Sequence, residues 1–251
     1  MDVVKYLSRI GVDFVPEPTA ENLKFLQKQH LYTVPYENTD ILKGIPIVLE
    51  HDALYDKIVT RHRGGYCFEL NELFGQLLRE LGYEVTDVFG RFLRGETGIP
   101  MRRHHILLVT AKDGTRLLAD VGVGSGSPTE AMELYEGSTY KDLDVTYRLR
   151  KDDVFSNVLE ETHEDGWRPV YCFTEEKQYP IDFVTTSFYC EKAPDSIFNK
   201  GYMVSVRTPD GRKTRDNDEF RIFAGGSVTA FTPSPAEADK LMSEWFGLYE
   251  N

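Results

Sequence analysis

The chain has 251 residues, of which 41% are hydrophobic and 28% charged, a composition typical of globular proteins with a substantial core. Disordered and fibrous proteins are therefore excluded. The 29 basic and 41 acidic residues leave a formal charge of -12, so we expect neither nucleic acid nor an anionic membrane as a partner.

The N-terminus and the cysteines favour a cytoplasmic protein. Residues 1–11 include acidic Asp2 and lack a long apolar core, and nowhere do about 18 apolar residues follow one another. Cys67, Cys172 and Cys190 are odd in number and widely spaced, which fits a reducing compartment better than a disulfide framework. A CxxC zinc or redox motif is absent, and we expect no metal.

Helical periodicity dominates the first third of the chain. Apolar residues at helical spacing predict one helix ending at Gly11 and another beginning after the potential cap Thr19. The strongest pattern follows RGGYC and ends at Gly82, with apolar positions at Leu70, Leu73, Phe74, Leu77, Leu78 and Leu81. Cys67 is therefore expected at or near the N-terminus of this helix.

From about residue 84 the apolar runs become short and are separated by turn residues, which predicts antiparallel strands. The runs are EVTDVF, HHILLVTAKDGTRLLADVGV, DVTYRLR, RPVYCF and YMVSVRTPDGRKT. A capping box with proline at the first helical position, at residues 234–237, predicts a final helix. Helices followed by strands and a mixed tail predict an α+β fold rather than a parallel βαβ sheet.

Cys67 is a candidate nucleophile. A helix N-terminus stabilises a thiolate through its unpaired N–H groups and macrodipole, which predicts a lowered pKa, and Arg61 and Arg63 add positive charge nearby. Gly64 and Gly65 carry no side chains, so a substrate could approach the sulfur closely. The alternative is a small buried core residue, the common state of a lone cysteine.

A thiolate nucleophile needs a base that a third group orients, and the segment from His104 to Val121 offers both. Asp113-Gly114 between two apolar runs predicts a hairpin with a two-residue turn. Pairing Lys112 with Thr115 then places Leu107 opposite Asp120.

In that register His105 lies on the same sheet face as Asp120, as its diagonal neighbour about 7 to 8 Å away between backbones. A hydrogen bond can bridge that distance, which predicts His105 as the base and Asp120 as the orienting group. A three-residue turn would shift the register by one and give the role to His104. The alternatives are a strand histidine satisfied in the core and an aspartate that only forms a turn.

Three segments resemble the signature segments of the arylamine N-acetyltransferases, in the same order and at similar spacing: RGGYCFELN (63–71), HHILLV (104–109) and LADVGVG (118–124). VPYEN (34–38) is similar to the family's VPFEN, and SFYCEKAPDSIF resembles a later block with its Ser-x-Phe ending at Ser196 and Phe198. Two positions depart from the common pattern, namely Val123 where many members have Phe and Thr39 where Leu is usual.

The resemblance implies a fold of three parts: an N-terminal helical bundle over residues 1–83 that carries the nucleophile, a central antiparallel β-barrel over 84–193 that carries His and Asp, and a C-terminal α/β lid over 194–251. The first two parts would be arranged as in thiol proteases and transglutaminases. It also implies the Cys67, His105 and Asp120 triad and ping-pong transfer of acetyl from acetyl-CoA to an arylamine, hydrazine or N-hydroxyarylamine.

Two segments are candidates for contacts with CoA. The N–H groups of Gly124, Ser125, Gly126 and Ser127 could cradle a pyrophosphate, although GxGxxG spacing is absent and a flexible strand-end loop is the simpler interpretation. The main basic cluster comprises Arg207, Arg212, Lys213 and Arg215, for which a solvated hairpin tip is the favoured interpretation.

Two other functional classes stay open beside an acyltransferase. A thiol hydrolase or transglutaminase-like enzyme shares the chemistry up to the acyl-enzyme and differs in whether water is excluded. A catalytically silent binding protein is disfavoured because Cys67, His105 and Asp120 are all present.

Overall fold

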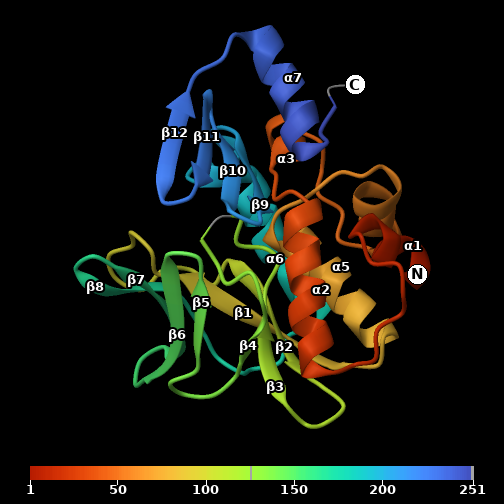
Figure 1. Ribbon diagram of the computed structural model, residues 1–251, viewed down its shortest axis with the longest axis vertical. Helices are drawn as coiled ribbons and strands as arrows, with labels where there is room; N and C mark the ends of the chain where they lie inside the picture. Colours follow the sequence, from red (N-terminus) through yellow and green to blue (C-terminus); the bar gives the residue numbers. More distant parts are fainter. Residues whose placement is uncertain (125, 250–251) are drawn as a thin grey trace.

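The computed structural model describes residues 1–124 and 126–249, and its N-terminal part is helical (Figure 1). The elements are α1 (Val3–Arg9), α2 (Ala20–Thr33), α3 (Thr39–Leu42), α4 (His51–Tyr55), the π-helical turn η1 (Asp56–Thr60) and α5 (Cys67–Glu80). Thr19 caps α2 as predicted, since its hydroxyl accepts a hydrogen bond from the Asn22 N–H at 3.2 Å. Most side chains of α5 are buried, so this helix forms the centre of the bundle.

The middle of the chain forms one antiparallel, barrel-like sheet (Figure 1). Its strands are β1 (Glu84–Phe92), β2 (His104–Thr110), β3 (Arg116–Ala119), β4 (Met132–Glu133), β5 (Thr139–Asp142), β6 (Val145–Asp152), β7 (Ser156–His163) and β8 (Gly166–Phe173). They follow the order β4-β3-β2-β1-β8-β7-β6-β5. One face of β2 packs with α5 through Leu107 and Val109, while Ile106 and Leu108 belong to the core cluster within the sheet.

The C-terminal part contains a second sheet and two helices. Its elements are α6 (Pro180–Lys192), the 3-10 turn η2 (Ile197–Asn199), β9 (Met203–Thr208), β10 (Gly211–Asp216), β11 (Glu219–Ala224), β12 (Ser227–Phe231) and α7 (Pro235–Phe246). The strands follow the order β12-β11-β10-β9, and α7 packs on them through Trp245 against Phe220 and Phe231. The predicted α+β class is confirmed, while the domain boundaries at residues 84 and 194 stay a prediction.

The β2–β3 hairpin differs from the predicted one by a single residue. Leu107 pairs with Ala119 rather than with Asp120, and the Ala111 N–H donates to the Thr115 carbonyl at 2.9 Å, which leaves three residues in the loop. Gly114 adopts a φ of 85°, the left-handed geometry of a type I turn followed by a bulge. The prediction of a two-residue turn was wrong because Asp-Gly serves both loop lengths.

This register decides which histidine shares a face with Asp120. With side chains alternating along β2, the face of Asp120 receives His104, and His105 turns to the face that meets α5 and α6.

Candidate active site

Cys67 is the first residue of α5, as the sequence predicts, and Tyr66 is its N-cap. The side chain is buried, and its Sγ lies 3.9 Å from the Arg103 carbonyl oxygen of the chain entering β2. Gly122 closes the site from the other side, because a Cβ there would lie only 2.6 Å from the Cys67 Cα. The nucleophile candidate is thus held between two segments that are distant from it in sequence.

The thiol of Cys67 is not pre-ionised by its helix position. Burial raises its pKa well above the usual range, and Cys190 and Asp120 add to the rise. Backbone N–H groups of His105 and Phe68 favour the thiolate without overcoming desolvation. The predicted lowering of the pKa was therefore wrong for the unliganded site, and ionisation requires a nearby proton acceptor.

The arginines and glycines before Cys67 serve the fold rather than the sulfur. Arg61 pairs with Asp56 at the surface, and Arg63 pairs with buried Glu37 at 2.7 Å. A Cβ on Gly64 would lie 2.0 Å from the Pro35 carbonyl oxygen, so this position needs glycine for chain packing. The positive charges of Arg61 and Arg63, which the sequence suggested would act on Cys67, are therefore neutralised by Asp56 and Glu37.

His104 and Asp120 form a buried pair. His104 Nε2 lies 2.7 Å from Asp120 Oδ2, and both side chains are almost fully shielded from solvent. Phe92 and Tyr171 pack against the imidazole with ring centroids 4.6 and 5.4 Å away. Within residues 1–124 and 126–249, His104 Nδ1 has no hydrogen-bond partner. Asp120 thus fixes Nε2 of the His104 ring, and Nδ1 is free to accept a proton.

Asp120 is held as a carboxylate by its neighbours. Burial would raise its pKa, but His104, the Asn71 amide and the Gly122 N–H together hold the pKa below its usual value. Asn71 Nδ2 donates to Oδ1 at 2.8 Å, and the Gly122 N–H donates to the same oxygen at 2.9 Å. Gln27 fixes the backbone by accepting from the Asp120 N–H at 2.9 Å. An ionised Asp120 can therefore orient the imidazole.

His105 occupies a different environment from the one predicted. Its Nε2 lies 3.0 Å from Asp87 Oδ1, and its ring stacks on Phe183 at 4.0 Å between centroids. The pairing of His105 with Asp120 was wrong because the hairpin loop has three residues. His105 still contributes backbone groups, since its N–H donates toward Cys67 and its carbonyl accepts from Asn71 Nδ2 at 2.7 Å.

Sequence reasoning missed Asn71 and the whole of α6. Asn71 is buried on the same side of α5 as Cys67, four residues later, and ties β2 to the segment after β3. The signal for α6 was present in Pro180 at the first helical turn and in Asp182, which accepts from the Tyr179 N–H at 2.8 Å. Ser187 of this helix lies 2.5 Å from the Tyr66 hydroxyl beside the site.

The glycine-rich segment after Asp120 lies at a cleft between the barrel and the second sheet. Gly124 has a φ of 82° and packs against Tyr36, and the Gly126 carbonyl accepts from Arg94 at 2.9 Å. Ser127 is buried, and Ser125 lies outside the described residues. Two adjoining pockets of about 270 and 420 Å³ have Gly124 and Gly126 on their walls, respectively.

The basic cluster is not a solvated hairpin tip. Arg207 is buried in an ion pair with Asp142, and buried Arg215 lies over the Tyr202 ring. Arg212 stacks on Phe223 with its guanidinium carbon 3.6 Å from the ring centroid, and both residues line both pockets. The interpretation of this cluster as a solvated hairpin tip was wrong, because β9 and β10 fold back over the barrel-like sheet.

The two departures from the family pattern have different surroundings. Val123 lines the smaller pocket beside Gly124, where its size affects the space available. Thr39 is buried away from that pocket, where its hydroxyl donates to Glu37 at 2.5 Å. Only Val123 is therefore placed to influence what the cleft accepts.

Among residues 1–124 and 126–249, no helix combines the length and apolar character needed to cross a membrane.

Comparison with known proteins identifies the family. Residues 19–249 match the profile of an N-acetyltransferase family. The arylamine N-acetyltransferase of Mycobacterium tuberculosis is 35% identical over an alignment of 254 residues that covers 99% of this chain and 89% of that protein. The Mycolicibacterium smegmatis enzyme is 38% identical, covering 91% of this chain and 84% of that protein.

Solved structures agree in fold. The M. smegmatis arylamine N-acetyltransferase superposes with a TM-score of 0.92 at 34% identity, covering 99% of this chain and 92% of that chain. The Mycobacterium marinum enzyme in complex with CoA gives a TM-score of 0.91 at 31% identity, covering 98% and 92%. The chain therefore belongs to the arylamine N-acetyltransferases, a family of acyltransferase enzymes.

Proposed function

We propose that the protein transfers acetyl from acetyl-CoA to an arylamine, a hydrazine or an N-hydroxyarylamine through a thioester on Cys67, with His104 as base and Asp120 as its orienting group. The observation that carries this proposal is the His104–Asp120 hydrogen bond of 2.7 Å, which leaves His104 Nδ1 without a partner among the described residues. His104 lies between Arg103 and His105, whose backbone groups both approach Cys67 Sγ.

In the first half-reaction the Cys67 thiol gives its proton to His104 Nδ1 and the sulfur attacks the acetyl carbonyl of acetyl-CoA. The bond between the acetyl carbon and the CoA sulfur breaks, and the departing CoA thiolate takes the proton from His104. Burial raises the pKa of Cys67, so transfer to a fixed imidazole is the route to the nucleophile. Asp120 stabilises the transient imidazolium and holds its tautomer.

In the second half-reaction the acceptor nitrogen attacks the thioester carbonyl, and His104 removes a proton from that nitrogen. The bond between the acetyl carbon and Cys67 Sγ breaks, the departing thiolate takes the proton back from His104, and the acetylated acceptor is released from the restored enzyme. Amine rather than water must reach the thioester, because hydrolysis would discard the acetyl group. The match to the acetyltransferase family supports transfer over a thiol hydrolase.

We place the phosphates of CoA near Arg212. Its guanidinium lines both pockets of the cleft, and its Nε has no hydrogen-bond partner among the described residues. Burial, followed by the charge of Arg207, lowers the pKa of Arg212, which indicates a cation in need of an anionic partner. The segment Gly124–Ser127 stays a candidate for further contacts with CoA.

The test is acetylation without an acceptor. We expect acetyl-CoA alone to add one acetyl group to the protein, on Cys67, seen by intact mass and peptide mapping. Addition of an arylamine should then remove the label and yield the acetylated amine. Cys67→Ala should take up none.

The other cysteines provide the internal control. Burial raises the pKa of Cys190 to about 11 and also raises the pKa of Cys172, as it does for Cys67, but the proposal assigns a base to Cys67 alone, so both should remain unlabelled. Label on either of them, or a wild-type protein without label, would contradict the assignment of Cys67. Loss of label to water as fast as to amine would instead support the hydrolase.

A further inference from the structure

We propose that His51, Glu72, Asp87 and His105 form a binding site for a divalent transition-metal ion, with Zn²⁺ the best match. This site is separate from the His104–Asp120 pair and lies on the opposite face of β2, between α4, α5, β1 and β2. The proposal does not depend on the acyl-transfer mechanism.

The central observation is the convergence of three buried ligand-type side chains. One oxygen each from Glu72 and Asp87 and one nitrogen of His105 lie within 4.8 Å of one another. Around a tetrahedral zinc ion with bonds of about 2.0 Å, neighbouring ligand atoms are about 3.3 Å apart. His105 Nε2 and Asp87 Oδ1 are already 3.0 Å apart, so small side-chain rotations suffice.

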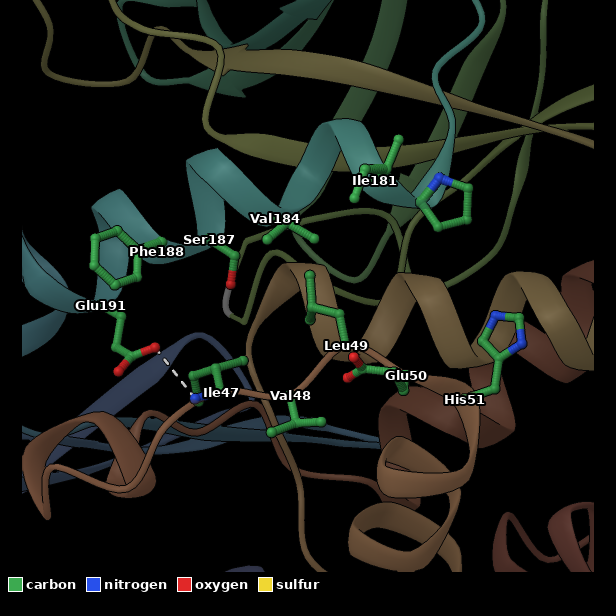
Figure 2. Close-up of a pocket in the computed structure, with 11 residues that line it drawn as sticks. Ile47, Val48, Leu49, Glu50, His51, Ile181, Val184, Ser187, Phe188 and Glu191 are labelled. Atoms are coloured by element: carbon green, nitrogen blue, oxygen red, sulfur yellow. Dashed lines mark hydrogen bonds between the residues drawn. The ribbon is translucent and has the colours of Figure 1, made fainter.

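His51 contacts Glu72 but lies outside the group of three within 4.8 Å, so it would complete the ligand set through a side-chain movement. Its Nε2 lies 2.8 Å from Glu72 Oε1, and its side chain is 42% exposed whereas that of Glu72 is 4% exposed. His51 stands at one end of a pocket of about 590 Å³ between α6 and residues 47–51 (Figure 2). His51, which contacts buried Glu72, is therefore the member of the proposed set that lines this pocket.

The charges of the cluster suit a cation. Two buried carboxylates, Glu72 and Asp87, lie in this group beside the His105 imidazole. Arg79 pairs with Asp87 Oδ2, which leaves Oδ1 facing His105. Because Arg79 also repels an approaching cation, the site should bind more weakly than a structural zinc site without such a neighbour.

The donor set decides the class of ion. Two imidazoles and two carboxylates suit Zn²⁺ and Co²⁺, whereas Mg²⁺ and Ca²⁺ prefer oxygen ligands throughout. Binding would move the His51 and His105 protons from Nε2 to Nδ1 and replace the two existing hydrogen bonds by metal bonds. Phe183 stacks on His105 and keeps its ring oriented toward the cluster.

Co²⁺ titration of the full chain tests the site, because cobalt in zinc sites has visible d–d absorption. The Cys67→Ala protein is used so that the active-site thiol cannot bind the ion. We expect one Co²⁺ per chain, displaced by Zn²⁺, and a melting temperature that rises with Zn²⁺ concentration. Equilibrium dialysis with Zn²⁺ gives the stoichiometry independently.

Ligand variants locate the ion. In the Cys67→Ala background, His51→Gln and Glu72→Gln should each weaken binding by about 10-fold or more. His163→Gln is the matched control, since His163 is 38% exposed and lies 3.2 Å from Glu161 in a similar pair, which belongs to no group of three ligand-type side chains among the described residues. It should bind Co²⁺ as the Cys67→Ala parent does.

His51 is half-exposed, so His51→Gln should fold normally. Its Co²⁺ affinity therefore tests the site even if Glu72→Gln fails to fold. Three outcomes would overturn the proposal: no stoichiometric Co²⁺ or Zn²⁺ binding, equal affinity in His51→Gln and the parent, or a near-ultraviolet thiolate charge-transfer band. The last would assign the ion to Cys172 or Cys190.

Discussion

His104 Nε2 lies 2.7 Å from Asp120 Oδ2, and the next residue along β2, His105, turns its ring to the opposite face of the strand. The two adjacent histidines thus form two separate histidine–aspartate pairs, His104–Asp120 beside Cys67 and His105–Asp87 beside Glu72. The single extra residue in the β2–β3 loop decides which of them faces Asp120.

Replacement of His104 by Gln should reduce single-turnover acetylation of Cys67 by orders of magnitude, because no base remains to accept the thiol proton. His105→Gln should keep acetylation within about 10-fold of wild type, since the backbone N–H at position 105 is retained. Mass spectrometry of the acetyl-enzyme measures both. Loss of acetylation in His105→Gln but not in His104→Gln, at an unchanged melting temperature, would instead identify His105 as the base.

Asp120→Asn should preserve the fold and lose most of the acetylation rate. An amide can present its NH₂ group to His104 and favour the wrong tautomer, which in serine triads costs about 10⁴ in rate. Rate is measured by single-turnover labelling and folding by thermal melting. An unchanged rate would show that Asp120 only organises the turn through its contacts with Gly122 and Asn71.

Arg212→Gln should raise the KM for acetyl-CoA about 10-fold or more and leave the acetylation rate at saturating acetyl-CoA nearly unchanged, because the residue is proposed to bind a phosphate of CoA rather than the reacting thioester. Lys213→Gln is the matched control. Lys213 directly follows Arg212 on β10 and lies on the other face of the strand, with its ammonium 5.2 Å from the Trp245 ring centroid. Equal effects of both variants would indicate only a general loss of positive charge.

His30 should make the protein less stable as the pH falls below about 6.5. Burial, followed by the charge of Arg9, lowers the pKa of His30 to about 3. Below about pH 6.5 the unfolded chain therefore binds a proton at His30, whereas the folded chain does not. The free energy of unfolding should therefore decrease from pH 6.5 to 5 by up to about 1.4 kcal/mol per pH unit from this group.

His30→Gln should flatten that slope, measured by urea unfolding across the same pH range. His62 is exposed, and His62→Gln is the control that should change the slope much less. A His30→Gln protein with the wild-type slope would show that other groups cause the acid sensitivity.

Lys57→Met should destabilise the fold by about 3–5 kcal/mol, because it leaves buried Glu69 without its cation, whereas Asp40 keeps its ion pair with Arg63. Lys57 Nζ lies 2.7 Å from Asp40 and 2.8 Å from Glu69, the residue that caps the start of α5. Urea unfolding provides the measurement. Lys24→Met removes the surface pair with Glu21 and should lower the free energy of unfolding by less than about 1 kcal/mol. Equal losses in both variants would show that burial of the Lys57 pairs does not add to their effect on stability.

The sequence by itself determined the class of the fold and the position of the candidate nucleophile. The periodicity before Gly82, the shift to short apolar runs after residue 84 and the capping box at Ser234 are local signals, and each gives an element in the structure. Cys67 could be placed at the first turn of α5 for the same reason, since the helix pattern begins immediately after it.

Only the tertiary structure decided which histidine is paired with Asp120. Asp113-Gly114 is compatible with two loop lengths, and the choice depends on how β2 and β3 pack against α5 and the barrel core. The pKa of Cys67 was likewise undetermined, because the helix N-terminus is a local feature whereas burial is a property of the assembled fold. The contacts of Asn71 and the meeting of Glu72, Asp87 and His105 join distant segments, so no spacing along the chain could reveal them.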